Sequence, residues 1–214
     1  MGTPRRARPA LPDAQVDTAR VMAFVNTLSG RETPAPNERL TSYEALVEWA
    51  RAEGVVTAAA ADRLASQARH HADAARHALA RARELRETLH ALFAAVDHGR
   101  APSDAVLATL SAHIGAAYAQ ARLVPHEGAL QWAPGVATSL DHVGAEMARA
   151  AGRLVTSAEL ARVRACAAQD CRWWFVDETK NRSRRWCDMK ICGNREKLRR
   201  FRAKGTSPGK GSPA

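Results

Sequence analysis

The sequence has 214 residues, enough for one hydrophobic core or for one core and a small additional module. Hydrophobic residues make up 46% of the chain and aromatic residues only 5%, and alanine supplies much of the hydrophobic part, which favours packed helices. The formal net charge is +10, yet residues 166–204 alone hold 12 basic and 5 acidic residues, a net charge of +7. Neither a run of about 18 apolar residues nor a secretory signal is visible, so we expect a cytoplasmic protein and exclude a membrane-spanning one.

The first part of the chain predicts a disordered tail followed by helices. Residues 1–12 are rich in Pro and Arg, and a helix is expected over 13–28. The prolines within 30–40 predict a loop. Thr41, with a glutamate three residues later, resembles a capping box that begins the next helix, and Gly54 ends that helix.

The longest expected element is a helix over about 57–96, because this stretch contains neither Gly nor Pro. His70 and His71 interrupt its apolar stripe and mark the place where the helix could break. The apolar residues that recur three, four or seven positions apart are Leu64, Ala68, Ala75, Leu79, Ala82, Leu89, Phe93 and Val96. The elements expected next are a turn, a helix, a small β-hairpin, a helix and a short helix, over residues 97–102, 104–121, 122–134, 136–154 and 157–164.

Four cysteines, all that the chain contains, form the pattern C-x4-C-x15-C-x4-C near the C-terminus. They are Cys166, Cys171, Cys187 and Cys192. If a hairpin folds the chain back, the two pairs meet, and four thiolates around Zn²⁺ form a closed tetrahedral site with no open catalytic position. In a reducing compartment such a cluster is more often metal-bound than oxidised. We therefore predict one structural zinc ion; reduced core thiols, an oxidised pair, or iron in the same site are the alternatives.

The residues around the cysteines predict a small zinc finger that resembles a treble clef. The aromatic-rich segment 172–177 is expected to form one strand and 184–187 the returning strand. Residues 193–202 predict a helix with Leu198 and Phe201 facing inward. Because so small a unit buries little apolar surface, metal binding is expected to supply most of its folding free energy, on the order of 10 kcal/mol.

The segment Cys192 to Arg195 reads CGNR, the motif that names the CGNR zinc-finger family. The runs CRWWFVD from Cys171 and RRWCDMK from Arg184 resemble the same family. Such fingers usually follow an ABATE-type helical domain, and FVNT and LRETL, in the first and the long expected helix, resemble that domain. The resemblance implies a stress-linked transcription regulator. One departure is Ala23, where the family tends to carry an acidic residue, so no ligand role of that residue is carried over.

The domain organisation that follows is mainly α. We expect a helical ABATE-like domain over 13–160 and a four-cysteine finger over 161–204. Residues 1–12 would be a disordered tail and 205–214 a flexible Gly/Ser/Pro tail. The helical domain could receive a signal, bind a protein partner or form a homodimer.

Clustered basic residues in the finger predict a surface for the phosphates of DNA. Some of these charges could instead neutralise the thiolates or cap a helix, and Asn194 and Arg195 could either read bases or brace the fold. The three tryptophans of the finger are more often core than stacking platforms. The predicted nucleic-acid contacts are Arg182, Arg184, Arg185, Lys190, Asn194, Arg195, Lys197, Arg199, Arg200, Arg202 and Lys204.

The sequence gives no positive sign of an enzyme, because it lacks a Ser/His/Asp order, a P-loop and a glycine-rich phosphate cradle. Asn26 and Arg86 could line a polar ligand pocket in the helical domain, although hydrogen bonds that bridge helices explain them equally well. We therefore predict a non-enzymatic, zinc-binding, DNA-binding transcription regulator. The alternatives are a finger that binds protein or RNA, and an enzyme or ligand sensor with a pocket in the helical domain.

Overall fold

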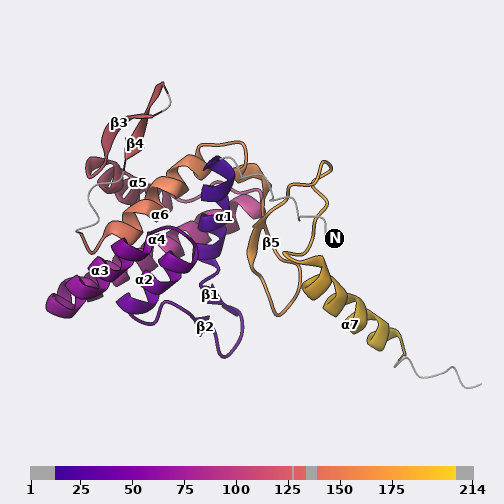
Figure 1. The fold of residues 1–214 in the computed structure, drawn as a ribbon. Coiled ribbons are helices and arrows are strands. Elements are labelled where there is room, and N and C mark those ends of the chain that lie inside the picture. The colour runs from indigo at the N-terminus through magenta and orange to yellow at the C-terminus, as the bar shows by residue number, and fades with distance from the viewer. Residues whose placement is uncertain (1–12, 127, 134–138, 206–214) are drawn as a thin grey trace, which may run out of the picture.

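The computed structural model describes residues 13–126, 128–133 and 139–205, and it confirms a mainly α fold (Figure 1). The expected tails lie outside the described residues, except that Gly205 ends a helix. The helices are α1 (Asp13–Val25), α2 (Tyr43–Ala52), α3 (Ala58–His70), α4 (Ala72–Asp97), α5 (Asp104–Ala119), α6 (His142–Val155) and α7 (Asn194–Gly205), with single turns η1 (Leu160–Arg162) and η2 (Met189–Gly193). The antiparallel strand pairs are β1 (Leu28–Ser29) with β2 (Asn37–Glu38), β3 (Arg122–His126) with β4 (Ala129–Ala133), and β5 (Val163–Ala165) with β6 (Trp174–Val176).

The core lies between α4 and the helices α1, α2, α5 and α6, which pack around it. Phe24 of α1 and Trp49 of α2 meet with ring centroids 5.4 Å apart, and Phe93 of α4 is fully buried. None of the described helices is both long and apolar enough to cross a membrane. The core therefore buries the apolar face that the sequence predicted for the long helical stretch.

That long stretch is two helices, because the chain leaves helical geometry at His71, which has φ −134° and ψ 58°. The expected single helix over 57–96 is therefore wrong, and the break falls at the place that the interrupted apolar stripe marked. His71 still donates its backbone N–H to the carbonyl of Gln67 and accepts from Ala75, so only one residue leaves the helix. Since the break contains no Pro or Gly, packing against different neighbours decides it: α3 packs mainly on α2, whereas α4 also contacts α1, α5 and α6.

Several helix ends differ from the expected ones. α1 ends at Val25 rather than residue 28, because the Thr27 hydroxyl donates to the carbonyl of Phe24 and Leu28 pairs with β2. The N-cap of α2 is Ser42 and not Thr41, since the Ser42 hydroxyl accepts the Ala45 N–H. α6 is described from residue 142, and the expected start at 136 lies outside the described residues.

The strands of the finger pair differently from the prediction. β6 lies within the expected strand, but residues 184–187 form no strand, and the partner of β6 is β5, which precedes the first cysteine. Of the short helix expected over 157–164, only the single turn η1 forms, because residues 163 and 164 belong to β5. The register sets Val163 opposite Val176 and Ala165 opposite Trp174. The finger thus consists of a two-stranded pair and a helix, as expected, but β5 takes the place of the strand expected at 184–187.

Helix α7 extends away from the body of the molecule (Figure 1). Leu198 and Phe201 were expected to face inward, but they are 57% and 77% exposed. This prediction was wrong, because α7 makes its main contacts with η2 only and has no second layer to cover these side chains.

Candidate metal centre and nucleic-acid interface

The finger brings all four cysteine sulfur atoms together, and they lie within 4.8 Å of one another. The Sγ atoms of Cys171 and Cys187 are 3.5 Å apart, and those of Cys187 and Cys192 are 3.6 Å apart. None of the four thiols forms a disulfide. A regular tetrahedron with Zn–S bonds of about 2.3 Å places its sulfur atoms about 3.8 Å apart, so the four residues fit a zinc ion.

The protonation of the thiols also favours a cation at this point. Cys171 and Cys187 donate hydrogen bonds to the sulfur of Cys166, which lowers the pKa of Cys166. The same arrangement raises the pKa of Cys171 and of Cys187, chiefly because each hydrogen-bonds the anionic Cys166. Four sulfur atoms this close cannot all ionise without a positive charge between them, and a divalent metal supplies it.

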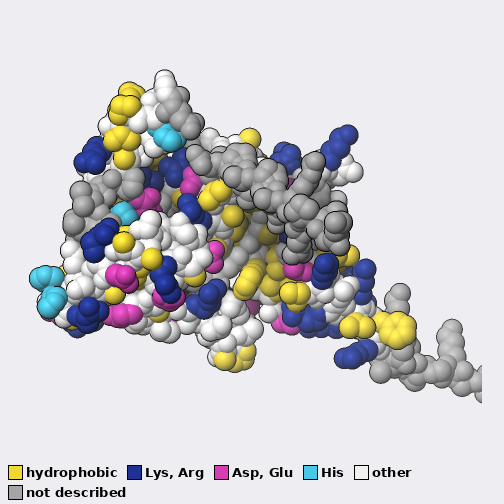
Figure 2. Space-filling model, in the orientation of Figure 1, with side chains coloured by type: hydrophobic (Ala, Val, Ile, Leu, Met, Phe, Trp, Pro, Cys, Tyr) yellow, Lys and Arg dark blue, Asp and Glu magenta, His cyan; other side chains and the backbone are white. Residues whose placement is uncertain are grey.

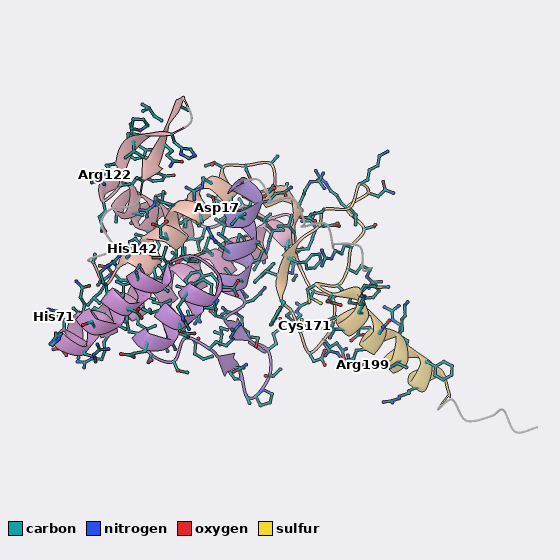
Figure 3. The ribbon with its side chains drawn as sticks, viewed as in Figure 1. Asp17, His71, Arg122, His142, Cys171 and Arg199 are labelled. Carbon is teal, nitrogen blue, oxygen red and sulfur yellow. The ribbon has the colours of Figure 1, made fainter. Side chains whose placement is uncertain are left out.

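Backbone and side-chain hydrogen bonds hold the cysteine loops in place. The Asp188 carboxylate accepts the Ile191 N–H at 2.9 Å, and the Asp188 carbonyl accepts the N–H groups of Cys192 and Gly193. The Cys187 N–H points at the sulfur of Cys166 at 3.4 Å. Such N–H donors stabilise thiolates and orient them toward a metal. Cys171 lies beside the start of α7, so the metal site fixes where that helix begins (Figure 3).

Residues 178–184 form a loop that is tied to one buried carboxylate. Asp177 accepts hydrogen bonds from the Thr179 N–H, the Thr179 hydroxyl and the Arg184 N–H. Burial acts to raise the pKa of Asp177, but these hydrogen bonds outweigh it and hold that pKa below its ordinary value. The Arg184 guanidinium, 4.8 Å from the centre of the Phe175 ring, covers the same loop.

The comparisons with known families agree with this geometry. Residues 162–205 match the CGNR zinc finger, and residues 18–158 match ABATE, described as a putative stress-induced transcription regulator. The chain belongs to the ABATE family. Together with the cysteine cluster, the CGNR match assigns one structural Zn²⁺ to this member of a regulator family. A search of curated proteins finds no match.

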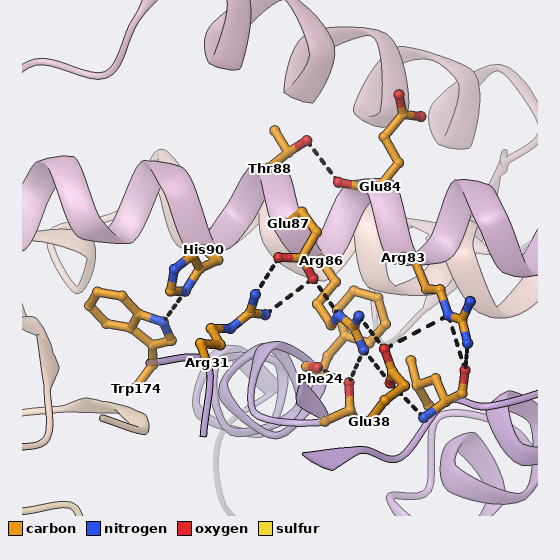
Figure 4. A network of polar contacts seen from close by, with 12 residues as sticks. Phe24, Arg31, Glu38, Arg83, Glu84, Arg86, Glu87, Thr88, His90 and Trp174 are labelled. Atoms are coloured by element: carbon orange, nitrogen blue, oxygen red, sulfur yellow. Dashed lines mark hydrogen bonds and ion pairs between the residues drawn. The ribbon is translucent and has the colours of Figure 1, made fainter. Parts of the chain in front are cut away.

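The CGNR finger is docked on the ABATE helices through Trp174. Its indole Nε1 donates to His90 Nδ1 at 2.9 Å (Figure 4). Its ring also lies edge-on to Phe93, with centroids 5.7 Å apart. Val163 and Trp174 are both part of the main hydrophobic core. The first β-pair of the finger therefore shares the core of the helical part.

Asn26 joins the two parts by a pair of buried hydrogen bonds. Its side-chain oxygen accepts the Trp174 N–H at 2.8 Å, and its side-chain nitrogen donates to the Trp174 carbonyl at 2.9 Å. The amide thus satisfies both backbone groups of one residue of β6, as a neighbouring strand would. This placement agrees with the alternative of a bridging hydrogen bond rather than a ligand contact.

Arg86 likewise has protein partners on every side (Figure 4). Its two Nη atoms donate to the Glu38 carboxylate at 2.7 and 2.6 Å, and its Nε donates to Glu87 at 2.9 Å. Burial acts to lower the pKa of Arg86, but the two carboxylates raise it above its ordinary value. Glu87 also pairs with Arg31, so the network ties the β1–β2 segment to α4. The structure places Asn26 and Arg86 in separate hydrogen-bond networks.

Three of the predicted nucleic-acid contacts have partners inside the finger. Arg195 pairs with Asp170 at 2.9 Å and points at the sulfur of Cys192 at 3.5 Å. Arg199 pairs with Glu196 and with Asp170. Arg184 donates to the carbonyls of Trp186 and Cys187. Arg195 and Arg199 thus pair with carboxylates and Arg184 with backbone carbonyls, and the bracing contacts of Arg195 agree with the alternative considered for that residue.

The other predicted contacts that the structure describes are exposed on α7 and the adjoining loops (Figure 2). Arg202 also interacts within the protein, and the side chain of Lys204 lies outside the described part. Among the predicted contacts in the described ranges, Arg182, Lys190, Asn194, Lys197 and Arg200 have exposed side chains that form no hydrogen bond or ion pair with described residues, and the Arg185 guanidinium lies 5.4 Å from the centre of the Trp186 ring.

Sequence reasoning missed three groups that organise the site: Asp170, Asp188 and His90. Asp170 and Asp188 stand one residue from a cysteine, which is a signal for a supporting role. His90 carried no such signal, because its partner Trp174 is 84 residues away. Of the tryptophans of the finger, Trp174 is buried as expected, whereas Trp173 is exposed.

Proposed function

We propose that this protein is a non-enzymatic, zinc-dependent transcription regulator that binds DNA through the CGNR finger. Its helical domain, residues 13–160, would carry the finger, residues 161–204, and Zn²⁺ held by the four cysteines would fix the start of α7. Neither family description names a reaction, and Asn26 and Arg86, the residues considered for a pocket, are occupied by protein partners.

The observation that carries the proposal is the pattern of side chains on α7. Asn194, Leu198 and Phe201 follow one another at intervals of four and three residues, so they form one exposed stripe. Lys197 and Arg200 flank that stripe and are exposed. This combination suits a helix in the major groove, where cations contact phosphates, an amide can pair with adenine, and apolar groups can contact thymine methyls.

The inward side of α7 supports the same orientation. Arg195 and Arg199 are held against Asp170, on the side of the metal centre. The stripe with Asn194 lies about a quarter turn further round α7 from these two arginines and is exposed. We accordingly assign phosphate contacts to Arg182, Lys190, Lys197 and Arg200, and base contact to Asn194.

The test is duplex binding by the zinc-loaded full chain at several salt concentrations. About four to six phosphate contacts predict a log–log slope of roughly −4 to −5, and Lys197→Ala should reduce it by about 1. Arg122→Ala, which removes an exposed cation from the hairpin, is the matched control and should leave the slope unchanged. Cys171→Ser should lower both the zinc content and the affinity. A slope near zero contradicts the proposal.

Base reading by Asn194 is measured separately. With a selected DNA site, Asn194→Ala should weaken specific binding by about 1–3 kcal/mol and leave non-specific binding nearly unchanged. Equal losses on both sequences contradict the assignment.

A finger that docks on a protein is the second candidate, and the exposure of Leu198 and Phe201 favours it. In that case Leu198→Asp abolishes partner binding while duplex DNA binding is absent from the start. Competition between duplex DNA and single-stranded RNA distinguishes the remaining nucleic-acid alternative.

A further inference from the structure

The β3–β4 hairpin carries an apolar face on its surface. Leu123 pairs with Trp132, and Pro125 pairs with Leu130. Paired residues of an antiparallel ladder point to the same side, and alternate pairs share a face, so these four side chains lie together. Leu123, Leu130 and Trp132 are 51%, 66% and 48% exposed. Figure 2 shows hydrophobic side chains on the projecting hairpin.

The hairpin has little support from the rest of the described chain. The Trp132 ring meets Tyr118 of α5 with centroids 5.4 Å apart, and the remaining strand pairs place Arg122 and Gln131 on the other face. A two-stranded hairpin alone is at best marginally stable in water, and it needs packing against another element. Its apolar face is the side on which such packing would occur.

Helix α5 extends this apolar face onto the body. Between Asp104 and Ala119 it contains no Lys, Arg or Glu, yet only Leu110 and Ala117 are buried. Its acidic and basic side chains are Asp104 in the first turn and His113, which lies 3.2 Å from the Glu84 carboxylate of α4. Leu107 is 44% exposed, and it precedes Tyr118 by eleven residues, about three helical turns, so both lie on one side of α5. We call the combined surface the arm surface; its residues are Leu107, Tyr118, Leu123, Leu130 and Trp132.

The absence of charge on the arm surface decides which partner it suits. In a twofold dimer the same patch meets itself, so any net charge on it meets a like charge. The five residues of the arm surface carry no charge, and Arg122, the exposed arginine of the hairpin, lies on the other face. Helix α7 also exposes apolar side chains, but Lys197 and Arg200 beside them would repel their own copies. Self-pairing is therefore compatible with the arm surface and unfavourable for α7.

We propose that the arm surface is the interface of a twofold symmetric homodimer, in which each hairpin packs on the other chain. The exposed parts of its large side chains amount to on the order of 400 Å² of apolar area. A standard interface buries about 800 Å² on each partner, somewhat over half of it apolar. The arm surface thus supplies most of the apolar area that a stable dimer needs, with a tryptophan among its residues, as interface centres favour.

This interface is independent of the proposed DNA binding, because the hairpin and α7 lie at opposite ends of the molecule (Figure 1). Dimerisation would leave both fingers accessible. Either inference can therefore fail without the other, and the experiment below contains no DNA.

The test is the mass of the full-length, zinc-loaded protein, measured by sedimentation equilibrium over a concentration series. We expect a mass near twice the chain mass of 23.2 kDa. Leu130→Asp should weaken the dimer at least about a hundredfold, since a symmetric interface contains each substitution twice. Gln131→Asp is the matched control: it introduces the same charge at the neighbouring residue, on the other face of the hairpin, and should leave the dimer intact.

A measurement on the unaltered chain keeps the proposal testable if Leu130→Asp affects folding. Hydrogen exchange at dimer-forming and at dilute concentrations should show protection of residues 122–126 and 129–133 that rises with concentration, and no such change in 194–202. The proposal is overturned by a wild-type protein that remains monomeric up to about 100 µM. It is also overturned if Leu198→Asp, rather than Leu130→Asp, dissociates the dimer, or if concentration-dependent protection appears only in α7.

Discussion

Replacing Asn26 tests whether one side chain ties the finger to the helical domain. Asn26→Ala removes both partners of the Trp174 backbone and leaves a buried N–H and a buried C=O unpaired. Each unsatisfied buried backbone group costs about 1–3 kcal/mol, so for the two groups we expect the free energy of unfolding to fall by about 2–6 kcal/mol. That is a large share of a domain stability of about 5–15 kcal/mol.

Asn26→Asp distinguishes the contribution of the side-chain donor from that of the side-chain acceptor in the two hydrogen bonds to Trp174. The aspartate retains an acceptor for the Trp174 N–H but places a second oxygen against the Trp174 carbonyl and buries a charge, so at neutral pH it should cost at least as much as alanine. When the carboxyl is protonated it can donate to that carbonyl. The deficit of this variant relative to wild type, measured at the same pH, should therefore shrink as the pH falls.

The assay is urea unfolding followed by far-UV circular dichroism and tryptophan fluorescence, with zinc content measured in parallel. Asn37→Ala, at an exposed asparagine, is the control and should change stability by no more than about 0.5 kcal/mol. Zinc content should stay complete in all three variants, because Asn26 contacts β6 and not the cysteines. An Asn26→Ala variant as stable as Asn37→Ala would refute the reasoning.

Three further predictions concern the metal, the Trp174 contact and the Arg86 network. Removing zinc with a chelator should abolish the helical signal of the 12-residue α7. The thermal transition of the helical domain should remain, because its core includes residues of β5 and β6. Loss of both signals together would contradict this prediction. Burial, together with Arg31, lowers the pKa of His90, so below about pH 6.5 the unfolded chain binds more protons than the folded one and stability decreases as the pH decreases. The difference in unfolding free energy between about pH 7.5 and about pH 5.5 should therefore be smaller in His90→Gln than in the wild type. An equal difference would count against the Trp174–His90 bond. Arg86→Met should destabilise the protein by about 2–4 kcal/mol in urea unfolding, which is less than for a fully buried ion pair because Glu38 is partly exposed. Adding Glu38→Leu should recover part of this loss. A double variant less stable than Arg86→Met alone would contradict the ion-pair account.

Features that depend on neighbours along the chain were predictable. The spacing of the cysteines identified the metal cluster, because a loop of fixed length and one returning segment suffice to bring the pairs together. The apolar periodicity identified the buried face of α3 and α4, and the interrupted stripe marked the break at His71. Turn residues and alternating apolar pairs identified the β3–β4 hairpin. In each case a local pattern determines local backbone geometry.

The sequence by itself thus determined a mainly α chain with a zinc finger at its C-terminal end, since helix periodicity and metal-ligand spacing are local properties. Only the tertiary structure decided that β6 pairs with β5, that Asn26 bonds Trp174 across 148 residues, and that Arg195 and Arg199 turn toward Asp170. It also decided that Leu198 and Phe201 are exposed. These outcomes depend on which surfaces meet in space, and a pattern that reports one face of one element cannot specify what that face will contact.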